Sequence, residues 1–113
     1  MTNHDQQRTI AIFADRLLPI LEALATSRND DTITYSVAAA LIRRRGEDMI
    51  PPQLIGKVLD EISENYDPNL VAFIVSKGTG QVSHGYDRGV ELGAPADPAE
   101  ARRLAREARG GRA

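Results

Sequence analysis

The chain has no cysteine and no tryptophan, and its net charge is only −2. The absence of cysteine excludes disulfide bonds, thiolate nucleophiles and cysteine-ligated zinc. Three tyrosines and two phenylalanines are the only aromatic residues, so the core must consist mainly of leucine, isoleucine, valine and alanine. No apolar run reaches the roughly 18 residues of a membrane-spanning helix, and the first residues lack the basic and apolar regions of a signal peptide. We therefore expect a cytoplasmic protein with no membrane partner.

Apolar residues make up 42% of the 113-residue chain, which is enough for one folded domain. Apolar side chains recur at steps of three and four over residues 6–26 and predict an N-terminal helix. Pro19 removes a backbone donor within this helix, so we expect a kink or two abutting helices. Thr34 is a suitable N-cap for a second helix over residues 35–45, and Gly46 suits its C-terminal end.

A third helix is expected from Pro51 and Pro52 to about Glu64, because proline tolerates the first helical turn. Gly56 lies inside this helix and suggests the close approach of another backbone. Residues 70–75 form an apolar, β-branched and aromatic run that predicts a buried strand. Residues 76–80 contain two glycines and predict a hairpin loop, after which residues 81–83 return as a second strand.

This order predicts an α+β fold of the winged helix-turn-helix kind, with an N-terminal helix, two central helices and a β-hairpin wing. Residues 1–88 would form the winged-helix-like domain, and residues 89–113 a linker and an Arg-rich tail that is helical or disordered. Asp97 and Glu100 resemble a capping box around Pro98. A helix after this cap would have Leu104 as its single large apolar residue, so it would have almost no apolar face for docking. The tail arginines suit either phosphate attraction or simple solvation; they are Arg102, Arg103, Arg106, Arg109 and Arg112.

Nothing in the chain predicts catalysis, a metal or a cofactor. The only histidines are His4 and His84, and a Ser-His-Asp set drawn from residues 83–87 cannot converge as a catalytic triad does. Asp60, Glu61 and Glu64 form an acidic helix face that has no histidine or second acidic cluster beside it. A solvated surface explains these carboxylates better than a metal site. We expect a protein that is not an enzyme.

The predicted nucleic-acid contacts surround the start of the third helix. Gln53 and Lys57 lie in the half of this helix that would read a DNA groove. The hairpin loop would hold the backbone, and flanking contacts would come from the second helix and from the segment after the wing. The full predicted set is Tyr35, Arg43, Arg44, Arg45, Gln53, Lys57, Lys77, Thr79 and Arg88. The arginine cluster also suits a helix C-terminus, and Tyr35 also suits packing, so both alternatives stay open.

The sequence resembles the C-terminal DNA-binding domain of alkylguanine-DNA alkyltransferases and alkyltransferase-like proteins. Residues 34–39 (Thr-Tyr-Ser-Val-Ala-Ala) fit the family's Thr/Ser-Tyr-x-x-x-Ala motif, residues 53–56 fall where its recognition helix begins, and residues 65–68 fall near that helix's end. Gly85 and Tyr86 match the closing Gly-Tyr. The resemblance implies the winged-helix architecture and places Tyr35 near a phosphate. Alkyl transfer is excluded because no thiolate exists, and Gln53 replaces the family's intercalating arginine, which argues against base flipping.

We therefore interpret the chain as a small, non-enzymatic DNA-binding accessory or regulatory protein. The alternative is a protein-interaction or inhibitor module on the same scaffold, possibly a homodimer. That module would use the acidic helix face of Asp60, Glu61 and Glu64, or an apolar strand edge. The strand-edge residues would be Val71, Phe73 and Val75. The near-neutral net charge favours this alternative over a dedicated nucleic-acid binder.

Overall fold

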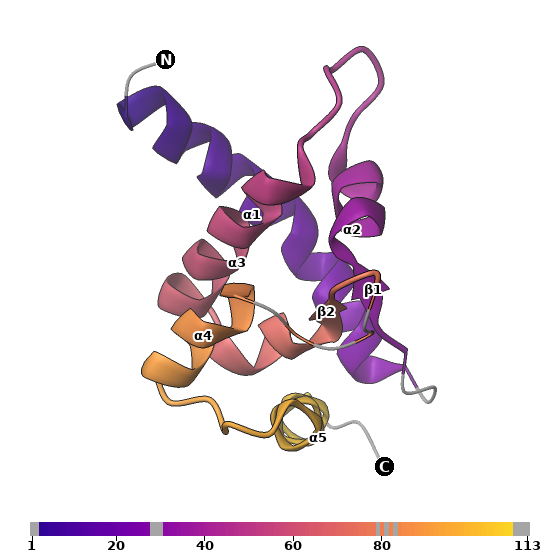
Figure 1. The fold of residues 1–113 in the computed structure, drawn as a ribbon, viewed down its shortest axis with the longest axis vertical. Helices are drawn as coiled ribbons and strands as arrows, with labels where there is room; N and C mark the ends of the chain where they lie inside the picture. Colours follow the sequence, from indigo (N-terminus) through magenta and orange to yellow (C-terminus); the bar gives the residue numbers. More distant parts are fainter. Residues whose placement is uncertain (1–2, 28–30, 79, 81, 83, 110–113) are drawn as a thin grey trace.

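Five α-helices, one 3-10 helix and two short strands make up the part of the chain that the computed structural model describes, namely residues 3–27, 31–78, 80, 82 and 84–109. The elements follow one another as α1 (Asn3–Thr26), β1 (Ile33–Thr34), α2 (Tyr35–Ile42), α3 (Pro52–Asn65), η1 (Pro68–Phe73), β2 (Ile74–Val75), α4 (His84–Glu91) and α5 (Pro98–Ala108). The protein is thus mostly helical, with a small sheet at one side (Figure 1). Within the described ranges, no helix combines the length and apolar character needed to cross a bilayer.

The sheet is parallel and joins two segments that are far apart in the sequence. Ile33 pairs with Ile74 and Thr34 pairs with Val75, so α2, α3 and η1 form the connection between the two strands. A wing would instead require antiparallel strands that are consecutive in the chain. The predicted return strand over residues 81–83 falls largely outside the described residues, since only residue 82 belongs to them.

The predicted strand over residues 70–75 is wrong for its first four residues, which belong to η1. The reason is local cap chemistry: the Asp67 side chain accepts a hydrogen bond from the Asn69 backbone N–H at 2.9 Å, and Pro68 occupies the first turn. Asp followed by Pro therefore starts a helical turn here rather than ending one. Leu70, Val71, Ala72 and Phe73 are buried on every side, and such an apolar run has no periodicity that separates a strand from a helix.

The two central helices largely confirm the sequence interpretation. Thr34 caps α2 and accepts a hydrogen bond from the Val37 N–H at 3.2 Å. Gly46 has a positive φ of 88°, but it lies in the following turn and the C-cap of α2 is Arg43, so the prediction that Gly46 ends this helix is wrong. However, α2 ends at Ile42, so the arginine cluster lies in the following loop rather than in the last helical turn. That loop, residues 43–51, is longer than the roughly three or four residues of a helix-turn-helix. The predicted close backbone approach at Gly56 is also wrong, because a Cβ there would meet nothing within 4 Å.

The core lies between α1, α3 and η1. The buried face of α3 is the predicted one, formed by Ile55, Val58, Leu59 and Ile62. It packs against Leu17 and Leu21 of α1, a helix that continues through Pro19, so the alternative of two separate helices is wrong. Phe73 is the largest fully buried side chain and carries no exposed surface. The apolar stripes of α1 and α3 thus face η1. Each of these two helices is apolar on one side only, whereas η1 is apolar all round and is covered on every side.

The segment that was expected to close a hairpin and begin a linker is the helix α4. Two glycines lower its intrinsic helix propensity, so its sequence gives a weak helical signal. Packing compensates: Tyr86 is buried, its hydroxyl donates to the Pro95 carbonyl, and α4 lies against α3 and η1. A Cβ on Gly89 would lie 3.1 Å from the Pro68 carbonyl oxygen and 3.2 Å from Val71 Cγ2, so a larger residue here would force α4 and η1 slightly apart.

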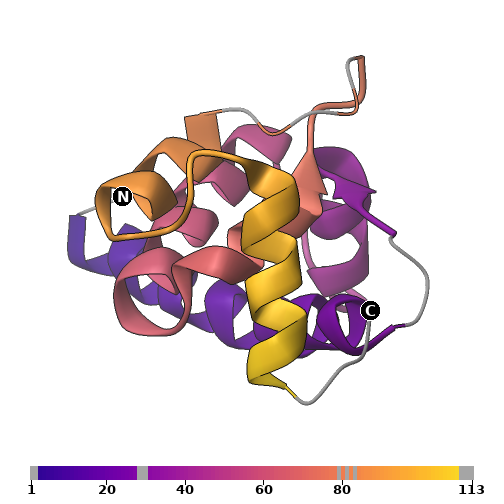
Figure 2. The ribbon, with the colours of Figure 1, turned by 90° about the horizontal axis from the view of Figure 1, so that it is seen from below.

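The Arg-rich tail forms α5, and the expectation that it has no face for docking is wrong. Asp97 caps the helix as predicted, accepting from the Ala99 N–H at 3.1 Å. Ala101 and Ala105 are fully buried where α5 crosses η1 (Figure 2), because small side chains allow close approach. The arginines reinforce this contact: Arg102 donates to the Ala72 carbonyl at 3.0 Å, and Arg106 lies over the Phe73 ring. Tail arginines therefore attach the helix to the core.

Candidate nucleic-acid interface

The start of α3 lies beneath a surface with three adjoining hollows. The first, about 290 Å³, is lined by Ser36, Ala39, Ala40, Arg43, Met49, Ile50 and Pro52. The second, also about 290 Å³, is lined by Tyr35, Pro52, Gln53, Ser76 and Lys77. The third, about 380 Å³, is lined by Pro51, Gln53, Leu54 and Lys57. Pro52 and Gln53 are shared between neighbouring hollows, so the three form one continuous surface, which we call the α3 face.

The α3 face brings together residues from three distant parts of the chain. Tyr35 comes from the start of α2, Gln53 from the first turn of α3, and Lys77 from the loop after β2. The parallel sheet causes this proximity, because pairing β1 with β2 places the residues that follow both strands at the same edge. Tyr35 is half-buried: one part of its side chain lines this surface, and another part packs against the core.

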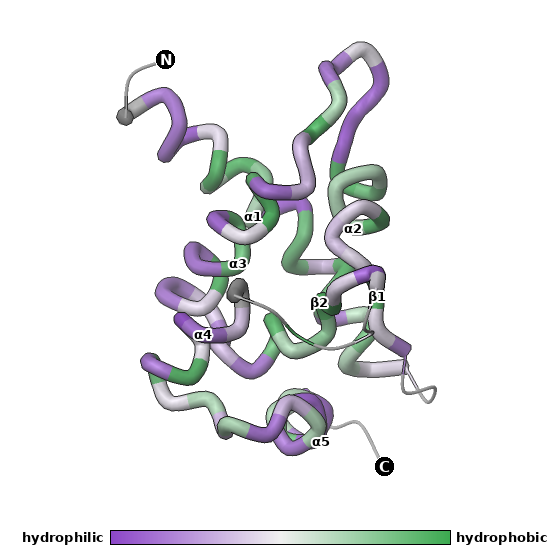
Figure 3. The backbone as a smooth tube through the Cα atoms, in the orientation of Figure 1, coloured by the Kyte–Doolittle hydropathy of each residue, from purple (hydrophilic) through white to green (hydrophobic). Residues whose placement is uncertain are grey.

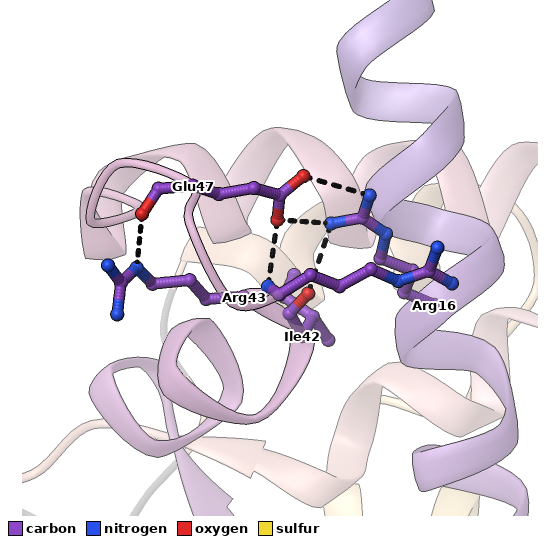
Figure 4. A network of polar contacts seen from close by, with 5 residues as sticks. Arg16, Ile42, Arg43 and Glu47 are labelled. Carbon is purple, nitrogen blue, oxygen red and sulfur yellow. Dashed lines mark hydrogen bonds and ion pairs between the residues drawn. The ribbon is translucent and has the colours of Figure 1, made fainter.

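A polar network positions Arg43 and shapes the loop between α2 and α3 (Figure 4). Arg16 of α1 donates two hydrogen bonds to the Glu47 carboxylate, at 2.7 and 3.0 Å, and a third to the Ile42 carbonyl at 3.2 Å. The Arg43 Nε donates to the Glu47 carbonyl at 2.7 Å, which orients its guanidinium. The pKa of Glu47 is lowered to about 2, first by the Arg16 hydrogen bond and then by the Arg44 backbone N–H. Sequence reasoning overlooked Arg16 and Glu47, whose pairing across 31 residues leaves no local signal.

The other two arginines of the cluster diverge from Arg43. Arg44 lines a different hollow of about 500 Å³, together with Ile12 and Leu41, on the side of α2 that faces α1. Arg45 is exposed at the turn that contains Gly46. The three consecutive arginines therefore do not form one basic patch, and only Arg43 borders the α3 face.

One further predicted contact, Arg88, does not join this face. Arg88 forms ion pairs with Glu64 at 3.0 Å and Glu91 at 2.8 Å, which places it at the opposite end of α3. Glu64 follows Gln53 by eleven positions along the helix, a rise of about 16 Å. Thr79 lies outside the described residues.

The far end of α3 is acidic. The pKa of Asp60 is raised, first by partial burial and then by the neighbouring carboxylates of Glu64 and Glu91. Glu61 accepts a hydrogen bond from the Asn65 side chain at 2.6 Å. The helix thus has lysine at its start and carboxylates at its end, a division that was already visible in the sequence.

The apolar strand edge of the alternative hypothesis is not a surface. Val71 and Phe73 carry no exposed area and Val75 is only 4% exposed. The first two belong to η1 rather than to a strand, and α1, α3, α4 and α5 enclose that element. The prediction that these side chains line an exposed edge is therefore wrong.

Comparison of the chain with protein-family models, with curated proteins and with solved structures found no match.

Proposed function

We propose that this chain is a small, non-enzymatic accessory or regulatory protein that binds duplex DNA through the α3 face. Gln53 and Lys57 contact the groove at the first turns of α3. Lys77, in the loop after β2, holds the phosphate backbone as a wing would, and Arg43 and Tyr35 flank the contact. In this proposal Lys77 does the work of a wing without an antiparallel hairpin, and the resemblance to alkyltransferase-like proteins supports the choice of the start of α3 as the reading element.

One observation carries the proposal: the three hollows of the α3 face are lined by Arg43, Lys57 and Lys77 and by no acidic residue. The whole chain has a net charge of −2, so its positive charge is concentrated on this surface more than its composition would suggest. Phosphates are attracted to surfaces of this kind without any sequence preference, and polar side chains such as Gln53 then read base edges.

The acidic end of α3 determines how the helix approaches DNA. Asp60, Glu61 and Glu64 would face phosphates if the whole helix lay deep in the major groove. Repulsion of these carboxylates would be strongest at low salt, where screening is weakest. Insertion of the N-terminal end alone keeps them about 10–16 Å from the groove, since each residue adds about 1.5 Å of rise. We therefore expect a shallow, end-on contact with a short binding site.

The test is a fluorescence-anisotropy titration of a random duplex at two salt concentrations. Three cations that release phosphate counterions give a slope of about −2.7 in log K against log salt, so affinity should fall about 40-fold between roughly 50 and 200 mM salt. The variant Lys57→Ala/Lys77→Ala should bind more weakly, and its plot of log K against log salt should become shallower, with a slope of about −0.9. Gln53→Ala should change the preference among duplex sequences more than the slope.

Arg88→Ala is the matched control, because it removes one positive charge at the acidic end of α3. Binding by this variant should equal that of the unmodified chain. No binding at low salt would refute nucleic acid as a ligand. Binding that is equally weakened by Arg88→Ala and by a single lysine substitution would refute the α3 face, since net charge alone would then explain it.

The alternative, a protein-interaction module, keeps support from one observation. The pKa of Asp60 is raised, first by its partial burial and then by the carboxylates of Glu64 in α3 and Glu91 in α4. Arg88 is the cation that pairs with Glu64 and Glu91 here, and a cationic partner would be attracted to the carboxylates of this surface. Flat titrations with DNA would make this acidic surface the one to pursue.

A further inference from the structure

The first hollow of the α3 face, between α2 and the start of α3, differs from other hollows of the molecule in the charge of its lining. Its only charged residue among those described is Arg43. The hollow between α1 and α2 holds two arginines against Asp15 and against Glu47, which is ion-paired to one of them. The hollow at the start of α5 holds Asp97 beside one arginine. The first hollow therefore carries an uncompensated positive charge, whereas the other two are balanced.

The floor of the first hollow is apolar. Ala39 and Ile50 are only 5% and 7% exposed, and Ala40 leaves room above α2 because its side chain is a single methyl group. Figure 3 shows α2 as hydrophobic and the loop after it as hydrophilic, so the hollow lies where apolar and polar surface meet. Its volume is about 290 Å³. One water takes about 30 Å³, so the hollow has room for a ligand of about eight to ten non-hydrogen atoms.

Met49 forms one side of the first hollow and is 83% exposed, more than any other large apolar residue among those described. Its position is fixed from both directions along the chain, because Glu47 is hydrogen-bonded to Arg16 and Ile50 is buried. A methionine side chain is flexible and polarizable, so it can cover an apolar ligand without displacing its neighbours. A ligand in the hollow would remove this side chain from water.

Arg43 supplies a polar group with unused donors at one end of the hollow. Its Nε donates to the Glu47 carbonyl at 2.7 Å, and no hydrogen bond or ion pair within the described residues engages its two terminal nitrogens. A carboxylate fits these nitrogens, because its two oxygens accept a pair of parallel hydrogen bonds from a guanidinium. Ser36 also lines the hollow, seven positions earlier, which is about 10 Å along the helix axis. A mostly apolar groove thus separates two polar ends.

The ends of two helices meet at the first hollow. The end of α2 disfavours an anion, whereas the start of the longer α3, at Pro52, favours one. These two dipole effects oppose each other, so the charge of Arg43 determines the preference for an anion.

We propose that the first hollow binds a small apolar acid, with its carboxylate on Arg43 and its hydrocarbon body over Ala39, Ala40 and Ile50. Concave sites with an apolar body and few polar groups are typical of small-molecule recognition. The bound acid neutralises one of the three cations of the α3 face, so it also weakens DNA binding. This regulatory part rests on the proposed function, whereas the binding of the acid is independent of it.

Sodium hexanoate is the probe, and NMR of the full chain without DNA is the measurement. The chain has only two methionines, so a ¹³C-methyl label on methionine gives a simple spectrum in which Met49→Leu identifies the Met49 signal. Hexanoate should shift this signal and the backbone amides of Ala40 and Ile50 in a saturable way, with a dissociation constant of about 0.5–5 mM. Hexan-1-ol lacks the charge and should bind about tenfold more weakly. Acetate lacks the apolar body and should give no saturable shift.

Three variants separate the charge of the hollow from its shape. Arg43→Gln should weaken hexanoate binding about tenfold, because a charged hydrogen-bond donor is lost. Arg45→Gln is the matched control, since this adjacent exposed arginine is absent from the lining of the hollow, and it should leave binding unchanged. Ala40→Leu fills the hollow from an exposed helical position and leaves the Glu47 network intact, so it should abolish binding while circular dichroism shows an unchanged fold.

Three results would overturn the binding of an apolar acid at this hollow. The first is no saturable shift at the Met49 methyl or the Ala40 and Ile50 amides up to about 20 mM hexanoate. The second is equal binding of hexan-1-ol, since no charge would then be recognised. The third is equal weakening by Arg43→Gln and Arg45→Gln, since net charge alone would then explain it.

The regulatory part is tested by repeating the DNA titration with saturating sodium hexanoate and with the same concentration of sodium acetate, which matches the ionic strength. Hexanoate should lower the DNA affinity about five- to tenfold relative to acetate, because one of three cations is neutralised. Hexanoate binding with unchanged DNA affinity would overturn the regulatory part. A chain that binds hexanoate but no DNA would refute the proposed function and support the acid site alone.

Discussion

The contact between α4 and η1 can be tested with one added methyl group. Gly89 lies in α4, and a Cβ there would be 3.1 Å from the Pro68 carbonyl oxygen, 3.2 Å from Val71 Cγ2 and 3.6 Å from Ser63 Oγ. Two of these neighbours resist displacement, because Pro68 contributes backbone and Val71 is fully buried. Gly89→Ala therefore requires α4 to move away from η1.

Two opposing terms determine the size of the effect. Alanine is favoured over glycine in a helix by about 1 kcal/mol, whereas overpacking a filled site costs about 1–3 kcal/mol. The net expectation for Gly89→Ala is a loss of about 0–2 kcal/mol in the free energy of unfolding. Gly56→Ala is the matched control in α3, where the added Cβ meets nothing within 4 Å. That variant should gain up to about 1 kcal/mol from helix propensity.

Thermal unfolding followed by circular dichroism measures the difference. For 113 residues, the entropy of unfolding of about 0.24 kcal/mol/K converts each kcal/mol into about 4 °C in Tm. The two variants should therefore differ by about 4–12 °C, with Gly56→Ala the more stable. Equal stabilisation by both alanines would refute the reasoning, because it would mean that α4 does not press against η1 at this distance.

Two further predictions concern the loop network and the core. Glu47 has a pKa of about 2 in the folded chain against an ordinary value of 4.5, so its carboxylate stabilises the fold above pH 4.5. The stability difference between the unmodified chain and Glu47→Gln should shrink as the pH falls from 4.5 towards 2, as urea unfolding at several pH values would show; a constant difference would contradict the Arg16 pairing. Phe73→Ala should lower the free energy of unfolding by about 3–5 kcal/mol, whereas a strand-edge position would lose far less.

Local signals predicted where the two central helices begin and which face of α3 is buried. Thr34 before an apolar run, two prolines at a helix start and the spacing of Ile55, Val58, Leu59 and Ile62 all depend on a few neighbouring residues. Such signals act within one or two turns, so their physics is present before any tertiary contact forms. The structure confirms the Thr34 cap and this buried face.

The error over residues 70–75 has a different origin. A segment that is buried on all sides shows no alternation and no helical stripe, because every direction is core. The backbone conformation was then determined by the Asp67 cap and by the space between α1, α3, α4 and α5. Burial of Phe73 follows from the same surroundings, which also explains why an interaction role for Val71 and Val75 cannot be sustained.

The residues of the candidate site also fall into two groups, those whose proximity the sequence predicts and those that only the tertiary structure places. Gln53 and Lys57 share one helix, so their proximity was predictable from spacing. Lys77 joins them only because β1 and β2 pair in parallel, and Arg88 leaves them because it pairs with Glu64. Both of these facts depend on contacts between residues far apart in the chain.

The sequence by itself therefore determined where α2 and α3 begin, the buried face of α3, the capping of α5, and the exclusion of thiolate and disulfide chemistry. These properties follow from short-range hydrogen bonding, helical periodicity and composition. Only the tertiary structure decided that Arg102 and Arg106 attach α5 to η1, and that the three consecutive arginines after α2 diverge. The physical reason is that burial and long-range ion pairing are properties of the assembled core, which no local stretch of residues encodes.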